Sequence, residues 1–167
     1  MIRVATSAIA TFYAPSDISG IGGMQCKCIH TMDTWQNGPG RHDCDFVSTD
    51  LAAEGMHGFN IACMKLLFSF KYNNSTYPCA LVHWYSHVGD SVDEDTGMWV
   101  VEPDYCEDGT HFGSVIHLEA IFRAAHLMPM YGDKFIPTHL SHTQSLDTFH
   151  AYYVNKYIDY HTFEIAF

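Results

Sequence analysis

The chain has 167 residues, of which 47% are hydrophobic and 16% charged, and its formal net charge is −11. This composition excludes an intrinsically disordered segment and predicts a single domain, 1–167. The excess of acidic side chains disfavours a surface that works by neutralising phosphates, so non-specific DNA binding by the chain alone is disfavoured, and direct DNA binding is left open. The sequence contains neither a membrane-spanning stretch nor a recognisable secretory leader, so we expect an intracellular protein without membrane contact.

The first third of the chain predicts short strands and a long loop. Residues 3–13 carry β-branched and aromatic residues with partial alternation, which indicates a strand. Residues 20–40 are rich in Gly, Asn, Asp and Thr and predict an irregular surface segment, with a turn at Asn37-Gly38-Pro39-Gly40. Residues 44–49 alternate weakly and indicate a short strand.

The middle of the chain gives the clearest local signal. Residues 64–72 and 76–88 are two runs rich in aromatic and β-branched residues, and Asn73-Asn74-Ser75 separates them, as in a β-hairpin. Bulky groups occupy both faces of these strands, so the hairpin should be central. Residues 98–102 predict a further strand after an acidic loop.

The last third of the chain predicts the helical part of the fold. Residues 115–130 begin as a strand and become a short helix over 119–125, and residues 131–145 form a loop. Apolar residues at helical spacing predict a helix over 146–163, with Ser145 or Ser141 as N-cap. The fold class we expect is α+β but β-rich: a small, partly open β-barrel with a C-terminal α-helix packed on it.

One group of residues has the chemistry of a metal site. Thiol and imidazole side chains are the ligands that zinc prefers, and five of them are close in sequence: Cys26, Cys28, His30, His42 and Cys44. Structural zinc sites usually separate the first two cysteines by two to four residues, whereas only one residue separates Cys26 from Cys28. A zinc site and a set of unmodified loop cysteines therefore both remain open, and no other cofactor is expected.

The sequence contains no assembled catalytic motif. It lacks a nucleophile elbow and a Gly-rich phosphate loop, so we do not expect an enzyme. Its many carboxylates and histidines leave a metal-dependent nuclease as an alternative. The basic side chains are scattered along the sequence, so only folding could gather them into a patch; they are Arg3, Lys27, Arg41, Lys65, Lys71, Arg123, Lys134 and Lys156.

Several long strings resemble one protein family. They are ATSAIATFYAPSDISGIGGM near the start, DEDTGMWVVEP in the middle, and IFRAAHLMPMYG and SLDTFHAYYVNKYIDYHTFE toward the end. Together they are similar to the C-terminal region of Plavaka-type, CACTA-like transposases of basidiomycete fungi. In that family the DNA-cleaving core resembles an RNase H fold and lies upstream of the matched region.

This resemblance implies a non-catalytic accessory domain of a transposase, which contacts a protein, chromatin or the rest of the transposase in the nucleus. No acidic residue of this chain then inherits a catalytic role. A module that reads transposon ends is the alternative within the same family.

A weaker resemblance, at the level of strand order, is to bromo-adjacent homology domains, which are β-rich barrels of chromatin proteins. It implies a histone-tail partner and an aromatic cage for an alkylammonium group, for which the candidates are Trp84, Tyr85 and Trp99.

Overall fold

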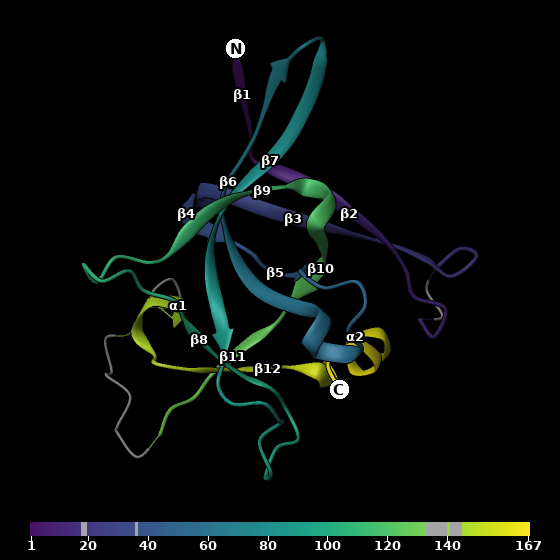
Figure 1. Ribbon diagram of the computed structural model, residues 1–167, viewed down its shortest axis with the longest axis vertical. Helices are drawn as coiled ribbons and strands as arrows, with labels where there is room; N and C mark the ends of the chain where they lie inside the picture. The colour runs from purple at the N-terminus through teal and green to yellow at the C-terminus, as the bar shows by residue number, and fades with distance from the viewer. Residues whose placement is uncertain (18–19, 36, 133–139, 141–144) are drawn as a thin grey trace.

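The computed structural model describes residues 1–17, 20–35, 37–132, 140 and 145–167, and it confirms the β-rich barrel with a short C-terminal helix (Figure 1). Nine strands form one antiparallel sheet, whose main path runs β10-β5-β6-β7-β8-β12-β11. These strands are β10 (Ile121–Ala125), β5 (Cys44–Ser48), β6 (Phe59–Tyr72), β7 (Ser75–His87), β8 (Val100–Pro103), β12 (Tyr152–Val154) and β11 (Leu127–Pro129). Off this path, β1 (Ile2–Ala5) pairs with β6 and β9 (Gly113–His117) pairs with β7.

The chain itself brings the barrel close to closure. The strands β10 and β11 lie at opposite ends of the sheet order, yet only His126 separates them in sequence. Asn155 donates its backbone N–H to the carbonyl oxygen of His126 at 2.9 Å and so fastens this junction to the segment after β12. The two ends of the sheet therefore meet at one seam.

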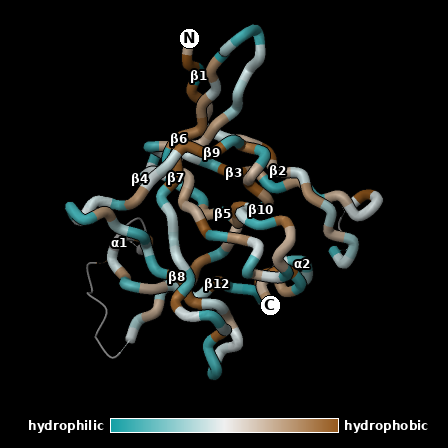
Figure 2. Tube along the Cα trace, viewed as in Figure 1, coloured by the Kyte–Doolittle hydropathy of each residue, from teal (hydrophilic) through white to brown (hydrophobic). Residues whose placement is uncertain are grey.

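The predicted central hairpin is confirmed, and it is longer than expected. Its two strands are β6 and β7, and Asn73 and Asn74 both have positive φ, the geometry of a tight turn between twisted strands. The tip of this hairpin and β1 project from the barrel as an arm (Figure 1). Apolar residues occur on β1 and along β6 (Figure 2), and all four residues of β1 are exposed.

The prediction of an irregular segment over residues 20–40 is wrong. This region forms β3 (Met24–Trp35) and β4 (Gly38–His42), and β3 also pairs with β2 (Ser7–Tyr13) in a separate three-stranded sheet. Buried Gln25, Ile29 and Thr31 lie on one face of β3, a pattern that its polar composition and exposed Lys27 hide. Asn37 provides the predicted turn, with φ of 62°. The small sheet packs on the large one through Ala10 and Ile29.

The first predicted strand divides in two. β1 and β2 are separated by Thr6 and pair with different partners, β6 and β3. The strands predicted over 44–49 and 98–102 are confirmed as β5 and β8.

The helix predicted over residues 119–125 is also wrong. A short 3₁₀ helix, η2 (Leu118–Ala120), precedes β10, which pairs with β5. The buried side chains of Ile121 and Arg123 fix this segment as a strand. The predicted loop 131–145 lies largely outside the described residues.

The helix predicted over residues 146–163 is much shorter in the structure. Here the chain forms α1 (Ser145–Thr148), β12, the 3₁₀ helix η4 (Lys156–Ile158) and α2 (Tyr160–Ile165). Tyr152 and Val154 are fully buried in the barrel between β8 and β11, which imposes a strand on a segment with helical spacing. Asp159, rather than a serine, caps α2. Among the described residues, no helix is long and apolar enough to cross a membrane.

Candidate functional site: a cationic cavity at the barrel seam

A cavity of about 320 Å³ opens beside the seam of the barrel. Its walls come from β3, from the β4–β5 junction, from β10 and the residue that follows it, and from η4. The lining residues are Lys27, Cys28, Arg41, Asp43, Cys44, Arg123, Ala124, Ala125, His126, Ile158 and Asp159. Because three cations face two carboxylates here, the cavity is locally cationic in a chain of net charge −11.

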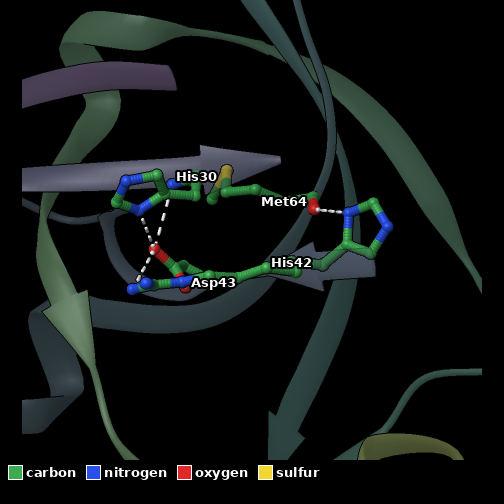
Figure 3. Close-up of polar contacts among 5 residues, drawn as sticks. His30, His42, Asp43 and Met64 are labelled. Carbon is green, nitrogen blue, oxygen red and sulfur yellow. Dashed lines mark hydrogen bonds and ion pairs between the residues drawn. The ribbon is translucent and has the colours of Figure 1, made fainter. Parts of the chain in front are cut away.

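The carboxylate of Asp43 organises one wall of the cavity. Its Oδ2 accepts from the backbone N–H of His30 at 2.9 Å and from His30 Nδ1 at 3.0 Å. Arg41 donates Nε to Oδ1 at 2.8 Å and Nη2 to Oδ2 at 3.2 Å. Figure 3 shows the His30 ring directed at Asp43. These contacts fasten β3 and β4 to the start of β5 and leave Asp43 saturated with donors.

Arg41 keeps binding capacity beyond this ion pair. The hydrogen bond to Asp43 raises the pKa of Arg41, so the guanidinium stays charged. It lies over the Trp35 ring at 5.0 Å, and its side chain is 42% exposed. A guanidinium carries five N–H donors in a rigid fork, and Asp43 takes only two of those of Arg41. The remaining donors are available to a second anion.

Arg123 forms the opposite wall and is fixed in place. It is only 2% exposed, and it donates Nη1 to Asp159 Oδ1 at 3.1 Å and Nη2 to Asp159 Oδ2. Nη1 also donates to His161 Nδ1 at 2.9 Å. Since a guanidinium can only donate, that imidazole nitrogen must accept, and His161 is neutral. Desolvation and the charge of Arg123 lower the pKa of His161 in agreement.

Asp159 links the cavity to the C-terminal helix. Partial burial by itself would raise its pKa, but hydrogen bonds from Arg123 and Thr162 lower the pKa of Asp159 to about 2. Its Oδ1 accepts from Thr162 N at 2.7 Å and from Thr162 Oγ1 at 2.8 Å, which caps α2. Asp159 is therefore ionised at neutral pH and holds α2, Arg123 and the cavity wall together.

The donors and acceptors of the cavity differ in how far protein partners occupy them. Both carboxylates, Asp43 and Asp159, accept hydrogen bonds from protein donors. Lys27 is exposed on β3 and makes no ion pair with a described residue, so its ammonium remains free to bind. Exposed Lys27 and Arg41 and buried Arg123 thus line the same cavity, and all three are donors of the kind that oxyanion groups accept from.

The predicted zinc ligands do not converge. Cys28 and Cys44 both line the cavity, whereas Cys26 contacts Thr11 Oγ1 at 3.5 Å. His30 is committed to Asp43, and His42 donates Nδ1 to the carbonyl oxygen of Met64 at 3.0 Å. Thr31 pairs with His42, so His30 and His42 lie on opposite faces of the β3–β4 pair, as Figure 3 shows. Within the described residues, no group of three or more His, Cys, Asp or Glu side chains could hold a metal ion.

The predicted aromatic cage of Trp84, Tyr85 and Trp99 is wrong. Tyr85 and Trp99 are each 3% exposed, and both rings pack in the hydrophobic core. Trp84 and Tyr85 are adjacent on β7 and point to opposite faces. Trp84 donates Nε1 to Ser114 Oγ at 2.7 Å, which orients it toward β9. The three rings serve packing, and no alkylammonium cage forms from them.

Sequence reasoning missed the cavity because its cations come from distant segments. Lys27, Arg41 and Arg123 lie on β3, β4 and β10, and no spacing rule relates them. The one local signal was the sequence Asp159-Tyr160-His161-Thr162, a helix-start pattern in which the acid precedes the threonine by three residues.

The chain is thus a small antiparallel β-barrel with a cavity beside its seam that basic and acidic side chains line. Comparison with family models, with curated proteins and with solved structures gives no match.

Proposed function

We propose that this chain is a non-catalytic binding domain that recognises an acidic segment of a partner protein through the cationic cavity. The observation that carries this proposal is the gathering of Lys27, Arg41 and Arg123 around one cavity, although the chain has only eight basic residues. A cavity of about 320 Å³ suits a carboxylate side chain rather than a duplex, and the acidic surface disfavours a polyanion such as DNA.

The three cations contribute to binding in different ways. Arg123 is immobilised by Asp159 and His161, so it loses no further side-chain freedom when a ligand arrives. Lys27 and Arg41 are the exposed donors that a partner carboxylate meets first. Charge-assisted hydrogen bonds from these groups are about twice as strong as neutral ones.

The resemblance of the chain to the C-terminal region of Plavaka-type transposases supplies the proposed setting. In that setting the partner is the catalytic core or another protein of the transposition complex, and the domain itself cuts no DNA. The histone-tail partner loses its support with the aromatic cage, since Tyr85 and Trp99 are buried. The proposed partner is acidic, whereas a histone tail is basic.

Fluorescence anisotropy with three labelled probes tests the proposal: a hexaglutamate peptide, a hexalysine peptide and a short DNA duplex. We expect the hexaglutamate probe to bind best, with an affinity that falls as salt rises. Replacing Lys27 and Arg41 by Gln should weaken it about tenfold or more, because one lost charge-assisted bond costs at least ~1.4 kcal/mol.

The matched control replaces Arg3 and Lys71 by Gln, which removes the same charge from the projecting arm. This control should bind hexaglutamate as the wild type does. Equal weakening by both double variants would mean general charge attraction and would overturn the assignment. Preferred binding of the duplex would favour the DNA-reading alternative, and preferred binding of hexalysine would place the function on the acidic surface.

A further inference from the structure

Two buried thiols face each other across neighbouring strands at the cavity wall. Cys44 on β5 pairs in register with Cys63 on β6, and they are 6% and 1% exposed. Among the six cysteines, this is a direct cross-strand pair; Cys79, also buried, pairs with Phe68 and His117 instead.

The strand register favours a bond between these two sulfur atoms. Met64 donates its backbone N–H to the carbonyl oxygen of Asp43 at 2.9 Å, which makes the neighbouring pair a hydrogen-bonded one. In an antiparallel ladder the two kinds of pair alternate, so Cys44 and Cys63 form a non-hydrogen-bonded pair, with Cα atoms about 4.5 Å apart. Disulfides span Cα separations of about 4.4–6.8 Å, so this pair fits with little backbone movement.

The cavity gives a small oxidant a path to this pair. Both cysteines belong to the same buried core cluster, but of the two only Cys44 also lines the cavity. Reagents should therefore meet Cys44 first, and Cys63 is placed to attack it from within the sheet. We propose that Cys44 and Cys63 are a reversible disulfide site, which a low-molecular-weight disulfide oxidises through the cavity.

The exchange has two steps that balance. The Cys44 thiolate attacks one sulfur of the small disulfide, forms a mixed disulfide and expels one small thiolate. The Cys63 thiolate then attacks the Cys44 sulfur, forms the cross-strand bond and expels the second small thiolate. The two cysteine protons end on the two released thiols, so the protein sulfurs are oxidised and the small disulfide is reduced.

Two physical consequences follow. The hydrogen bond with Cys63 and burial raise the pKa of the Cys44 thiol, so exchange should be slow at neutral pH and faster toward pH 9. The bond closes a loop of about 20 residues, and such a cross-link should raise Tm by roughly 7–13 °C in a domain of this size.

The sequence provides a direct readout. Trypsin cleaves after Arg41 and after Lys65, so one peptide, 42–65, contains both cysteines and no other cysteine. The folded protein is incubated with hydroxyethyl disulfide, unfolded, alkylated and digested. We expect peptide 42–65 to carry no alkyl group and to be lighter by two hydrogen atoms, while Cys79, in peptide 72–123 with the exposed Cys106, carries an alkyl group.

Variants make the result decisive. In Cys63→Ala, Cys44 can only hold the small thiol as a mixed disulfide, and the rise in Tm should be absent. Cys79→Ala is the control for a buried cysteine without a facing thiol, and it should form the cross-link as the wild type does. The proposal is overturned if wild-type peptide 42–65 carries two alkyl groups, or a persistent mixed disulfide, while the exposed Cys26, Cys28 and Cys106 have reacted.

Discussion

Asp45 lies in the middle of β5 with both carboxylate oxygens buried and without a hydrogen-bond partner among the described residues. Burial is the main cause that raises the pKa of Asp45 well above its ordinary value, and repulsion from Asp43 and Cys63 adds to it. Its neighbours across the sheet are Ala62 and Ala124, which offer no donor. A buried acid of this kind destabilises the fold whenever it must ionise.

We predict that Asp45→Asn stabilises the protein at pH 7 by about 1 kcal/mol or more, because it removes the cost of a buried carboxyl group. The folded pKa is raised, so the wild type loses stability as pH rises above about 4, where the unfolded carboxyl ionises. Thermal unfolding from pH 4 to 8 measures this. The gap between variant and wild type should grow with pH.

Asp33→Asn is the control for this measurement, since Asp33 is exposed on β3. It should leave Tm unchanged across the same pH range. A gap that shrinks with rising pH would contradict the buried-acid account.

Single residues also show where sequence reasoning fails. The types and strand positions of Trp84, Tyr85 and Trp99 were clear from the sequence, but burial, which depends on the whole barrel, decides whether a ring packs or binds. Cys28 and Cys44, which the sequence suggested as zinc ligands, both line the cavity. Their role as zinc ligands finds no support, because His30 and His42 point to opposite faces.

At the scale of elements, the position of the C-terminal helix α2 depends on the ion pair between Arg123 and Asp159. Removing the charge of Asp159 leaves Arg123 buried without its counter-ion. We predict that Asp159→Asn lowers stability at pH 7 by about 3 kcal/mol, the lower end for a broken buried pair. Asn caps helices as well as Asp does, so the substitution tests the ion pair and not the cap.

The pH dependence of Asp159→Asn follows from the lowered pKa. The contribution of Asp159 is present above its unfolded pKa near 4 and is lost as pH falls through about 2. The stabilities of the wild type and of Asp159→Asn, measured by acid unfolding, should therefore converge as pH falls from 4 to 2. Asp93→Asn is the matched control, because Asp93 holds Thr96 N and Oγ1 as Asp159 holds Thr162, without an arginine. If Asp93→Asn lowered stability as much as Asp159→Asn does, the hydrogen bonds to the threonine, and not the ion pair, would explain the loss.

The β6–β7 turn is the element that the sequence predicted best. Asn73 and Asn74 have φ of 46° and 62°, a conformation that costs a β-branched residue roughly 1–2 kcal/mol. We predict that Asn74→Val lowers Tm by roughly 2–8 °C in thermal unfolding, whereas Asn74→Gly leaves it equal or higher. An unchanged Tm in the valine variant would contradict the turn geometry.

The helix predicted from the spacing of apolar residues near the C-terminus is wrong because burial in the barrel imposes a strand there. Residues 146–163 repeat apolar side chains at helical intervals, yet Tyr152 and Val154 complete the barrel between β8 and β11. The hydrogen-bond partners of β12 come from segments far away in sequence, so no local pattern could reveal them. The hairpin needed only neighbouring residues, which is why it was predictable.

For the molecule as a whole, the β-rich barrel could be predicted from composition and the central hairpin, but its closure could not. The seam exists because β10 and β11 reach opposite ends of one sheet with only His126 between them. The cavity forms beside this seam, and only the closed barrel brings Lys27, Arg41 and Arg123 together. The net charge of the whole chain argued against anion binding, and it did not reveal that the charge around the cavity is positive.

The most direct test of the binding account is a nuclear magnetic resonance titration of the isotope-labelled protein with hexaglutamate. The account predicts saturable shifts of the backbone amides of Lys27, Arg41 and Arg123 and of the Arg41 Nε–H, with Arg3 and Lys71 unmoved. Shifts confined to the projecting arm, or no saturable shift at low salt, would contradict it.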